Sequence, residues 1–259
     1  MVKRIVKLIV SIFYFTKISI MDFFANTVLK KEKSKRLLIL YYHSIPSELK
    51  TRFLTQVKMI CNHCEVIKAH HFSTSNEGKS YLSITFDDGF ISVMNNALPV
   101  LEKYKLPATI FVPTKFIGTV PIWNTSSKYD ISNERVMSET ELKSLNRDLF
   151  SIGSHTVSHK SLTSLAWEDL NFEITKSKET LERILDYQIN SISFPHGAFN
   201  YEVIEVSKSA GYSDMHTVLP GYNYLGQNGF LLNRIWTDPS DWKIEFWLKL
   251  RGAYNWKLK

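Results

Sequence analysis

The stretch Ser83-Ile84-Thr85-Phe86-Asp87-Asp88-Gly89 decides the fold of this chain. β-Branched and aromatic residues dominate positions 81–86, which predicts a short strand that ends directly in two carboxylates and a glycine. In α/β folds the residues at the carboxyl ends of parallel strands face the ligand crevice. Neighbouring side chains at a strand end point in different directions, so one carboxylate can bind a cation while the other faces a reacting group. A plain Asp-Asp-Gly turn is the alternative interpretation.

A second predicted strand, over positions 149–154, ends in His155-Thr156-Val157-Ser158-His159. Two histidines four positions apart lie on one side of a helical turn or tight loop. Imidazole is a common ligand of Zn²⁺ and similar ions. Together with one of the two carboxylates, this pair would leave a coordination position open for water, as hydrolytic metal sites require. A solvated loop is the alternative interpretation of the histidine pair by itself.

These motifs, in this order, resemble the first two motifs of the polysaccharide deacetylases, also called the NodB-homology or carbohydrate esterase 4 family. Its third motif, a proline after a strand, is matched by Ser191-Ile192-Ser193-Phe194-Pro195-His196-Gly197. The resemblance covers residues 37–236 and implies an α/β fold, the incomplete (β/α)7-type barrel of this family. It also implies a metal-dependent hydrolase that removes N-acetyl groups from the amino sugars of a polysaccharide or its lipid-linked precursor.

The resemblance assigns a role to each motif residue. Asp88, His155 and His159 would hold one divalent metal ion, for which we expect Zn²⁺ with Co²⁺ or Ni²⁺ as alternatives. Asp87 would be the general base. The backbone N–H of His196 would stabilise the oxyanion that forms during acyl transfer.

The chain departs from the family pattern at two places. An arginine often lies two residues before the proline of the third motif, where it orients the catalytic aspartate, but this chain has Ser193 there. Arg234, near a late predicted strand, is a candidate replacement. No histidine follows His216, although a late motif normally supplies the general acid. His43, at the end of the first predicted strand, is therefore our first candidate acid, followed by His196 and then His216.

Pro195 and Trp123 are the expected substrate contacts. Trp123 lies in a long loop over 114–135, where it could stack on a sugar ring or pack against the barrel. Two other functions stay open. One is a deformylase or O-acetyl esterase acting on a related glycan. The other is an inactive carbohydrate-binding homologue, against which the retained aspartate and histidine pairs argue.

The net charge of +7 comes from one end of the chain. Residues 1–36 hold nine Lys or Arg against two acidic residues, whereas residues 37–259 are neutral overall. We therefore expect a basic amphipathic segment over 1–36 and a catalytic domain over 37–259. The neutral domain argues against nucleic-acid binding, which requires a basic face. Nothing in the composition indicates an oligomeric state.

The first fifteen residues predict an amphipathic helix with an apolar face. The opposite face is polar: Lys3, Arg4, Lys7 and Ser11. The longest charge-free stretch, 8–16, is shorter than the roughly 20 residues that span a bilayer. With the basic cluster at 30–36, the pattern predicts peripheral attachment to an anionic membrane, on its cytoplasmic face. Packing on the chain's own domain, or a signal anchor with the domain facing outward, are the alternatives.

Further strands and helices alternate along the rest of the chain, which favours parallel βαβ units. Strands are expected over 37–42, 108–113, 191–194 and 212–218, and helices over 53–60, 90–104, 138–147, 164–185 and 201–210. Ser138 and Glu141 have the spacing of a capping box. Cys61 and Cys64 are expected to pack at a helix end, because no second pair completes a zinc site.

Overall fold

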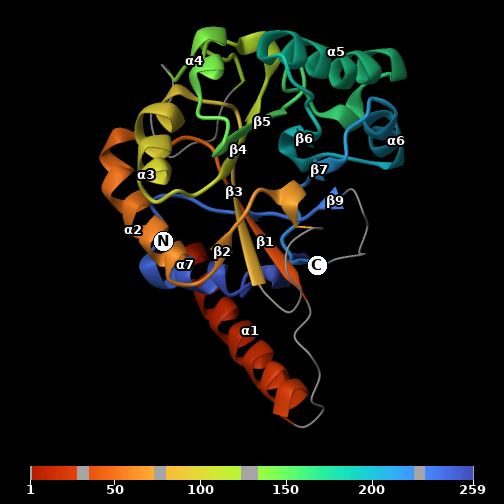
Figure 1. Ribbon diagram of the computed structural model, residues 1–259. Helices are drawn as coiled ribbons and strands as arrows, with labels where there is room; N and C mark the ends of the chain where they lie inside the picture. The colour runs from red at the N-terminus through yellow and green to blue at the C-terminus, as the bar shows by residue number, and fades with distance from the viewer. Residues whose placement is uncertain (1, 28–34, 73–79, 124–133, 225–230, 259) are drawn as a thin grey trace.

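In the computed structural model, which describes residues 2–27, 35–72, 80–123, 134–224 and 231–258, the strands form one strongly curved sheet (Figure 1). Its order is β10-β1-β3-β4-β5-β6-β7-β9, and all neighbours on this path are parallel. The strands on this path are β1 (Arg36–Tyr42), β3 (Ser80–Phe86), β4 (Ala108–Val112), β5 (Phe150–Ser154), β6 (Ser191–Ser193), β7 (Asp214–His216), β9 (Leu231–Leu232) and β10 (Ile235–Trp236). Two further strands, β2 (Glu65–Val66) and β8 (Asn223–Tyr224), pair with β3 and β1.

Helices cover the outside of this barrel (Figure 1). They are α1 (Val2–Thr27), α2 (Lys50–Cys61), α3 (Leu98–Lys103), α4 (Glu139–Ser144), α5 (Trp167–Leu185), α6 (Tyr201–Ser209) and α7 (Lys243–Leu250). The central strands β1, β3 and β4 are buried over almost their whole length, as the continuous apolar runs predict for parallel strands covered on both faces. The expected incomplete barrel is confirmed.

The carboxyl ends of the strands are tied to one another, and this alignment positions the site. The backbone N–H of Asp87, one residue past β3, donates to the carbonyl of Tyr42 at the end of β1 (2.8 Å). The N–H of His155, one residue past β5, donates to the carbonyl of Val112 at the end of β4 (3.0 Å). The aspartate pair and the first histidine therefore emerge at the same rim of the barrel.

The barrel has a seam where the last strands meet the first. β9 continues the sheet beyond β7, whereas β10 pairs with β1 at the other edge. Only Asn233 and Arg234 lie between β9 and β10. The N–H of Arg234 donates to the carbonyl of Leu219 (2.9 Å), and its side chain is completely buried. The guanidinium of Arg234, at this seam, thus places a full positive charge inside the barrel.

Of two helix starts expected from the sequence, one is confirmed and the other is wrong. Ser138 and Glu141 form the expected capping box at the start of α4. The expected start of a helix at position 164 is wrong, because Ser164 belongs to a short 3₁₀ turn, where its hydroxyl donates to the carbonyl of Ser161 (2.8 Å). α5 instead begins at Trp167, after the extended residue Ala166.

Helix α1 packs on the body beside α7 through a strip that holds Arg4 and Ser11 together with the partly buried Leu8 and Phe15. Arg4 donates to Glu245 (2.8 Å) and to the carbonyl of Ser240 (2.9 Å), and Ser11 is fully buried under Trp256. The apolar face therefore points away from the barrel. α1 continues as a projection from the body (Figure 1). Within the described residues, no helix has both the length and the apolarity needed to cross a bilayer.

Gly153 in β5 allows the strand to approach its neighbour closely, which gives a test of the barrel packing. A Cβ there would lie 2.5 Å from the ring of Phe111 and 3.0 Å from the carbonyl of Ser191. We expect Gly153→Ala to lower the free energy of unfolding by about 1–3 kcal/mol in urea titrations, because overpacking strains a filled core. Ser151→Ala on the same strand is the control, with an expected change below about 0.5 kcal/mol. Equal stability of the two variants would contradict this packing.

Candidate metal centre

Asp88, His155 and His159 converge at the rim of the barrel. One potential ligand atom from each lies within 4.8 Å of the others, and all three side chains are buried. Nε2 of His159 is 3.4 Å from Oδ1 of Asp88, and Nε2 of His155 is 3.7 Å from the same oxygen. Nδ1 of His155 is 2.7 Å from the carbonyl oxygen of Ser193, which assigns the proton to Nδ1 and leaves Nε2 free to bind a metal.

The chemistry of this donor set fits a divalent cation. Among the described residues, Oδ1 of Asp88 has no hydrogen-bond partner although it is buried. Burial and the charge of Asp87 raise the pKa of Asp88 well above its usual value, so its anionic form needs a cation beside it. Burial lowers the pKa of His155 to about 4 and that of His159 to about 2. Both imidazoles are therefore neutral at neutral pH, which is the form that binds metals.

The carboxylate of Asp87 is held by an arginine rather than by His155 or His159. The guanidinium of Arg234 donates to both carboxylate oxygens, at 2.7 and 2.9 Å. The same guanidinium donates to the hydroxyl of Ser193 (2.7 Å) and to that of Thr85 (3.2 Å), and its Nε donates to the carbonyl of Thr217 (2.8 Å). Arg234 thus pairs with Asp87, as the sequence suggested. Ser193, which stands where the family often has an arginine, accepts a hydrogen bond from Arg234.

This pairing fixes the protonation state of Asp87. Burial by itself raises the pKa of the carboxyl, but the charge and hydrogen bonds of Arg234 more than offset that effect and hold the pKa below its usual value. Asp87 is therefore an anion at neutral pH. Its neighbour Asp88 has a pKa shifted in the opposite direction, so the two adjacent carboxyls are electrostatically distinct.

Three site residues have left-handed backbone conformations, which are rare for residues other than glycine. Asp88 has φ 68°, His159 has φ 59° and His196 has φ 59°. Such conformations cost on the order of 1–3 kcal/mol each and persist only where the surrounding structure enforces them. At Asp88, the carboxylate faces the imidazoles of His155 and His159, whereas that of Asp87 faces Arg234.

A buried glutamate that the sequence analysis did not identify holds the histidine loop. Glu173 of α5 accepts hydrogen bonds from the backbone N–H groups of Val157 (2.9 Å) and Ser158 (2.8 Å), and also from the hydroxyl of Ser158. Its signal in the sequence is a carboxylate on the apolar face of α5, three residues after Leu170 and next to Ile174. A buried charge at such a position requires polar partners.

The candidate acids lie in different surroundings. His43 is exposed at the end of β1 and close enough to Asp87 and His155 for its charge to affect their pKa values. His196 is also exposed, and its ring is 4.8 Å from that of His159. His216 is completely buried beneath Phe111, at a ring distance of 4.7 Å, away from solvent. This placement favours His43 and His196 over His216.

The two expected substrate contacts also border the site. Trp123 stacks on His159 with ring centroids 4.2 Å apart, and its edge contacts Phe116. Trp123 therefore packs against the imidazole of His159 at the border of the site. Pro195 is buried and begins the turn that presents His196. Most of the rest of the expected loop over 114–135, residues 124–133, lies outside the described residues.

Known proteins resemble this chain in sequence and in fold. A family model described as polysaccharide deacetylase matches residues 74–215. YxkH of Bacillus subtilis (strain 168), whose name assigns it to the polysaccharide deacetylases, is 29% identical over 82% of this chain and 75% of its own length. The poly-beta-1,6-N-acetyl-D-glucosamine N-deacetylase of Staphylococcus aureus (strain MSSA476) is 26% identical over 66% of this chain, which spans 63% of that protein. The structure of IcaB from Ammonifex degensii has a TM-score of 0.72 at 19% identity, over 86% of this chain and 98% of that one.

The pairing of Arg234 with Asp87 predicts a specific pattern of stability. Arg234→Met should lower the free energy of unfolding by roughly 3–5 kcal/mol, because it leaves a buried carboxylate without a counter-charge. Adding Asp87→Asn should recover part of that loss, since the carboxylate is then absent. The control is Arg135→Met, which breaks the partly exposed ion pair with Glu141 and should cost about 1 kcal/mol or less. Denaturant titrations that give equal losses for Arg234→Met and Arg135→Met would contradict the assignment.

Proposed function

Because this chain belongs to the polysaccharide deacetylase family, we propose that its barrel is a metal-dependent hydrolase that removes N-acetyl groups from the amino sugars of a glycan. The observation that carries the proposal is the joint placement of two groups at one rim of the barrel. One is the cluster of Asp88, His155 and His159, and the other is the carboxylate of Asp87 held by Arg234. A hydrolytic site requires both a cation-binding set and a separate base.

The proposed substrate class is a polymer of N-acetylated amino sugars or its lipid-linked precursor. The staphylococcal relatives are named for N-deacetylation of poly-beta-1,6-N-acetyl-D-glucosamine. We extend that class to this chain on the strength of the matching family and of the site geometry. Pro195 and Trp123, which border the site, are the proposed contacts of the sugar that carries the acetyl group.

The residues of the site divide the chemistry between them. When bound by Asp88, His155 and His159, a divalent ion supplies a Lewis acid that polarises the acyl carbonyl and acidifies water. Asp87, an anion whose orientation Arg234 fixes, accepts the proton of the attacking water. The N–H of His196 donates to the oxygen that becomes negative as the acyl carbon turns tetrahedral. The C–N bond then breaks, and the amine leaves with a proton from an imidazolium, for which we propose His43.

Zinc is the ion we propose. Two neutral imidazoles and one carboxylate are the ligand types of many catalytic zinc sites, which use three protein ligands and leave the remaining position open. Co²⁺ and Ni²⁺ accept the same nitrogen and oxygen ligands. Mg²⁺ and Ca²⁺ fit less well, since both prefer sites made of oxygen ligands alone.

We also propose that α1 attaches the enzyme to an anionic membrane surface. The helix packs on the barrel through Arg4, Ser11 and Phe15, whose ring lies 5.0 Å from that of Trp247. Its outward apolar side chains are between 37% and 74% exposed: Val2, Ile5, Val6, Ile9, Val10, Ile12, Phe13, Ile20, Met21, Phe23 and Phe24. An exposed apolar face of this size is typical of a surface that contacts a membrane or another protein.

The positive charge of this segment favours an anionic membrane as the surface that contacts the apolar face. At 100° per residue, Lys3, Lys7 and Lys17 lie on one flank of the outward face, and all three are exposed. Long basic side chains on the flank of an apolar face can reach lipid phosphates while the face enters the acyl boundary. The net charge of +7 within residues 1–36 strengthens that attraction.

Two substitutions should separate the roles of the site residues. Asp87→Asn should lower acetate release from N-acetylated oligosaccharides by at least about 100-fold, because the amide cannot accept the proton of water. The variant should still bind one equivalent of zinc. His159→Ala should lose both acetate release and zinc, and His63→Ala, at the far end of the barrel, is the control that should lose neither.

The panel of substrates includes N-formyl and O-acetyl analogues, which test the two related hydrolases. Faster release from either analogue than from N-acetyl sugars would replace the proposed reaction. Near-normal turnover by Asp87→Asn would refute the assignment of the base. If the unmodified protein bound sugar but neither released acetate nor held stoichiometric zinc, it would be a carbohydrate-binding protein instead.

Membrane attachment predicts that the outward face of α1 controls binding to vesicles. The double variant Val6→Ser and Phe13→Ser should bind phosphatidylglycerol vesicles at least about tenfold more weakly in co-sedimentation, since it removes two large apolar groups from the contact. Phe172→Ser on α5, where the side chain is 54% exposed, is the matched control and should bind normally. Unchanged binding of the double variant would refute the proposal. If the unmodified protein were a dimer and the same variant a monomer, the apolar face of α1 would contact a second copy of the chain instead.

A further inference from the structure

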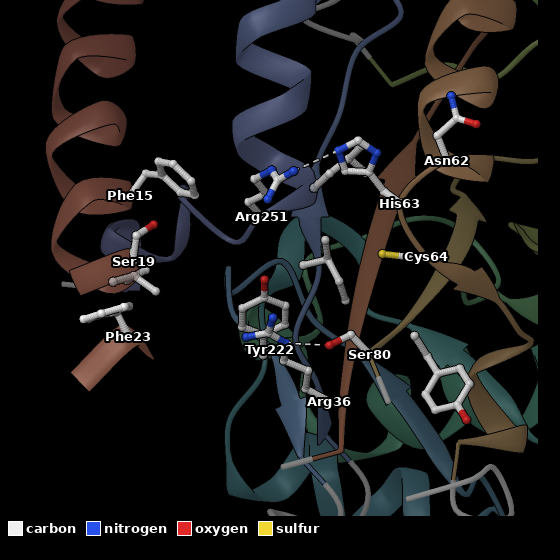
Figure 2. Close-up of a pocket in the computed structure, with 14 residues that line it drawn as sticks. Phe15, Ser19, Phe23, Arg36, Asn62, His63, Cys64, Ser80, Tyr222 and Arg251 are labelled. Carbon is white, nitrogen blue, oxygen red and sulfur yellow. Dashed lines mark hydrogen bonds between the residues drawn. The ribbon is translucent and has the colours of Figure 1, made fainter. Parts of the chain in front are cut away.

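A pocket of about 580 Å³ opens at the end of the barrel opposite the metal centre (Figure 2). It lies at the amino-terminal ends of β1 and β3, whereas the site residues follow the carboxyl ends of the same strands. Phe15, Ile18 and Phe23 of α1 form one wall. Figure 2 shows Phe15 and Phe23 facing a group of polar residues across the opening. The volume is within the range of small-molecule sites.

The polar side of the pocket is cationic. Its lining includes Arg36 and Arg251, and none of the described residues that line it carries a carboxylate. Arg36 donates to the hydroxyl of Ser80 (2.9 Å) and stacks on Tyr222 at 4.6 Å, and Arg251 stacks on Trp247 at 4.3 Å. Neither guanidinium takes part in an ion pair among the described residues. Each guanidinium is oriented by its stacking partner and by a hydrogen bond, Arg36 with Ser80 and Arg251 with Nε2 of His63 (3.4 Å), and no carboxylate in the described part of the chain pairs with either.

Both guanidinium groups lie close enough to Cys64 for their positive charges to affect its pKa. Each opposes the rise that burial causes in the pKa of Cys64, which also lines the pocket. The carboxyl-terminal ends of α2 and α7 also border this region, and each contributes about half a negative charge. Two full positive charges exceed these two partial ones, so the pocket retains a net attraction for anions.

The apolar wall belongs to the same helix that we propose to lie on the membrane. Phe23 lines the pocket and is still 64% exposed, so the pocket wall is continuous with the outward apolar face of α1. A ligand that fits this arrangement has an anionic head beside the arginines and a hydrocarbon chain along Phe15, Ile18 and Phe23. Guanidinium groups suit phosphate oxygens in particular, because their N–H groups can donate to two oxygens at once.

We propose that this pocket binds the phosphate head of an anionic membrane lipid, with Arg36 and Arg251 as the phosphate contacts and α1 along the acyl chain. The site lies apart from the catalytic rim and does not depend on the proposed reaction. Occupied in this way, it would turn the end of the barrel that bears α1 toward the membrane and the metal centre away from it. That orientation leaves the catalytic rim accessible to a glycan chain.

Isothermal titration of the full chain with dihexanoyl phosphatidic acid, below its micelle concentration, tests this inference. We expect one lipid per chain. The double variant Arg36→Gln and Arg251→Gln should bind at least about tenfold more weakly. Arg183→Gln on α5, which removes one exposed charge elsewhere, is the control and should bind normally. Ser19→Trp adds bulk to the pocket wall without changing charge, and it should also weaken binding at least about tenfold.

Two further titrants identify the source of the anion. Inorganic phosphate tests for a free-anion site, and octanoate tests for a chain with a carboxylate head. Either one binding as tightly as the lipid would overturn the proposal, as would lipid binding that is insensitive to both pocket variants. Thermal unfolding of each variant establishes that it is folded. Acetate release is measured separately, so a failure of the lipid site and a failure of the proposed reaction are distinguishable.

Discussion

The buried ion pair between Arg234 and Asp87 is the interaction on which the site depends. Burying two charges is costly, and here the cost is offset by a two-point contact and by hydrogen bonds from Arg234 to Thr85, Ser193 and Thr217. Arg234 lies at the seam between the last two strands of the barrel. Closure of the barrel therefore also brings Arg234 to Asp87, which fixes the charge and the orientation of this carboxylate. This coupling explains how the chain keeps an oriented aspartate without the arginine usual in the third motif.

The rim of the barrel could largely be predicted from the sequence. Parallel strands end at one edge, so Asp87, Asp88 and His155 had to meet once their strands were recognised. The family resemblance named Arg234 as a candidate partner of Asp87, but the residues alone do not show that the pKa values of Asp87 and Asp88 shift in opposite directions. That distinction arises from Arg234, which is 147 residues away from Asp87 along the chain, and the pairing of such distant residues depends on tertiary structure. Glu173 was missed for the same reason, since its partners lie on a loop before α5.

The orientation of α1 shows a second limit of sequence patterns. A helical projection separates an apolar face from a polar one, but it does not tell which of them meets the domain. Here Arg4 and Ser11 pack inward because α7 and its flanks offer Glu245, the carbonyl of Ser240 and the indole N–H of Trp256. The apolar face is left outward, next to a cationic pocket. Both features lie at the end of the barrel that we propose faces the membrane, opposite the rim that bears Asp87, Asp88 and His155.

The most direct test of this account is acetate release by chelated protein during titration with Zn²⁺. The account predicts no release from an N-acetylated glucosamine oligomer before the metal is added, and a linear rise that stops at one equivalent per chain. The same titration of Asp87→Asn should show one bound equivalent and almost no acetate. Full activity in the chelated protein, or a saturated metal site with no release from any acylated sugar, would contradict it.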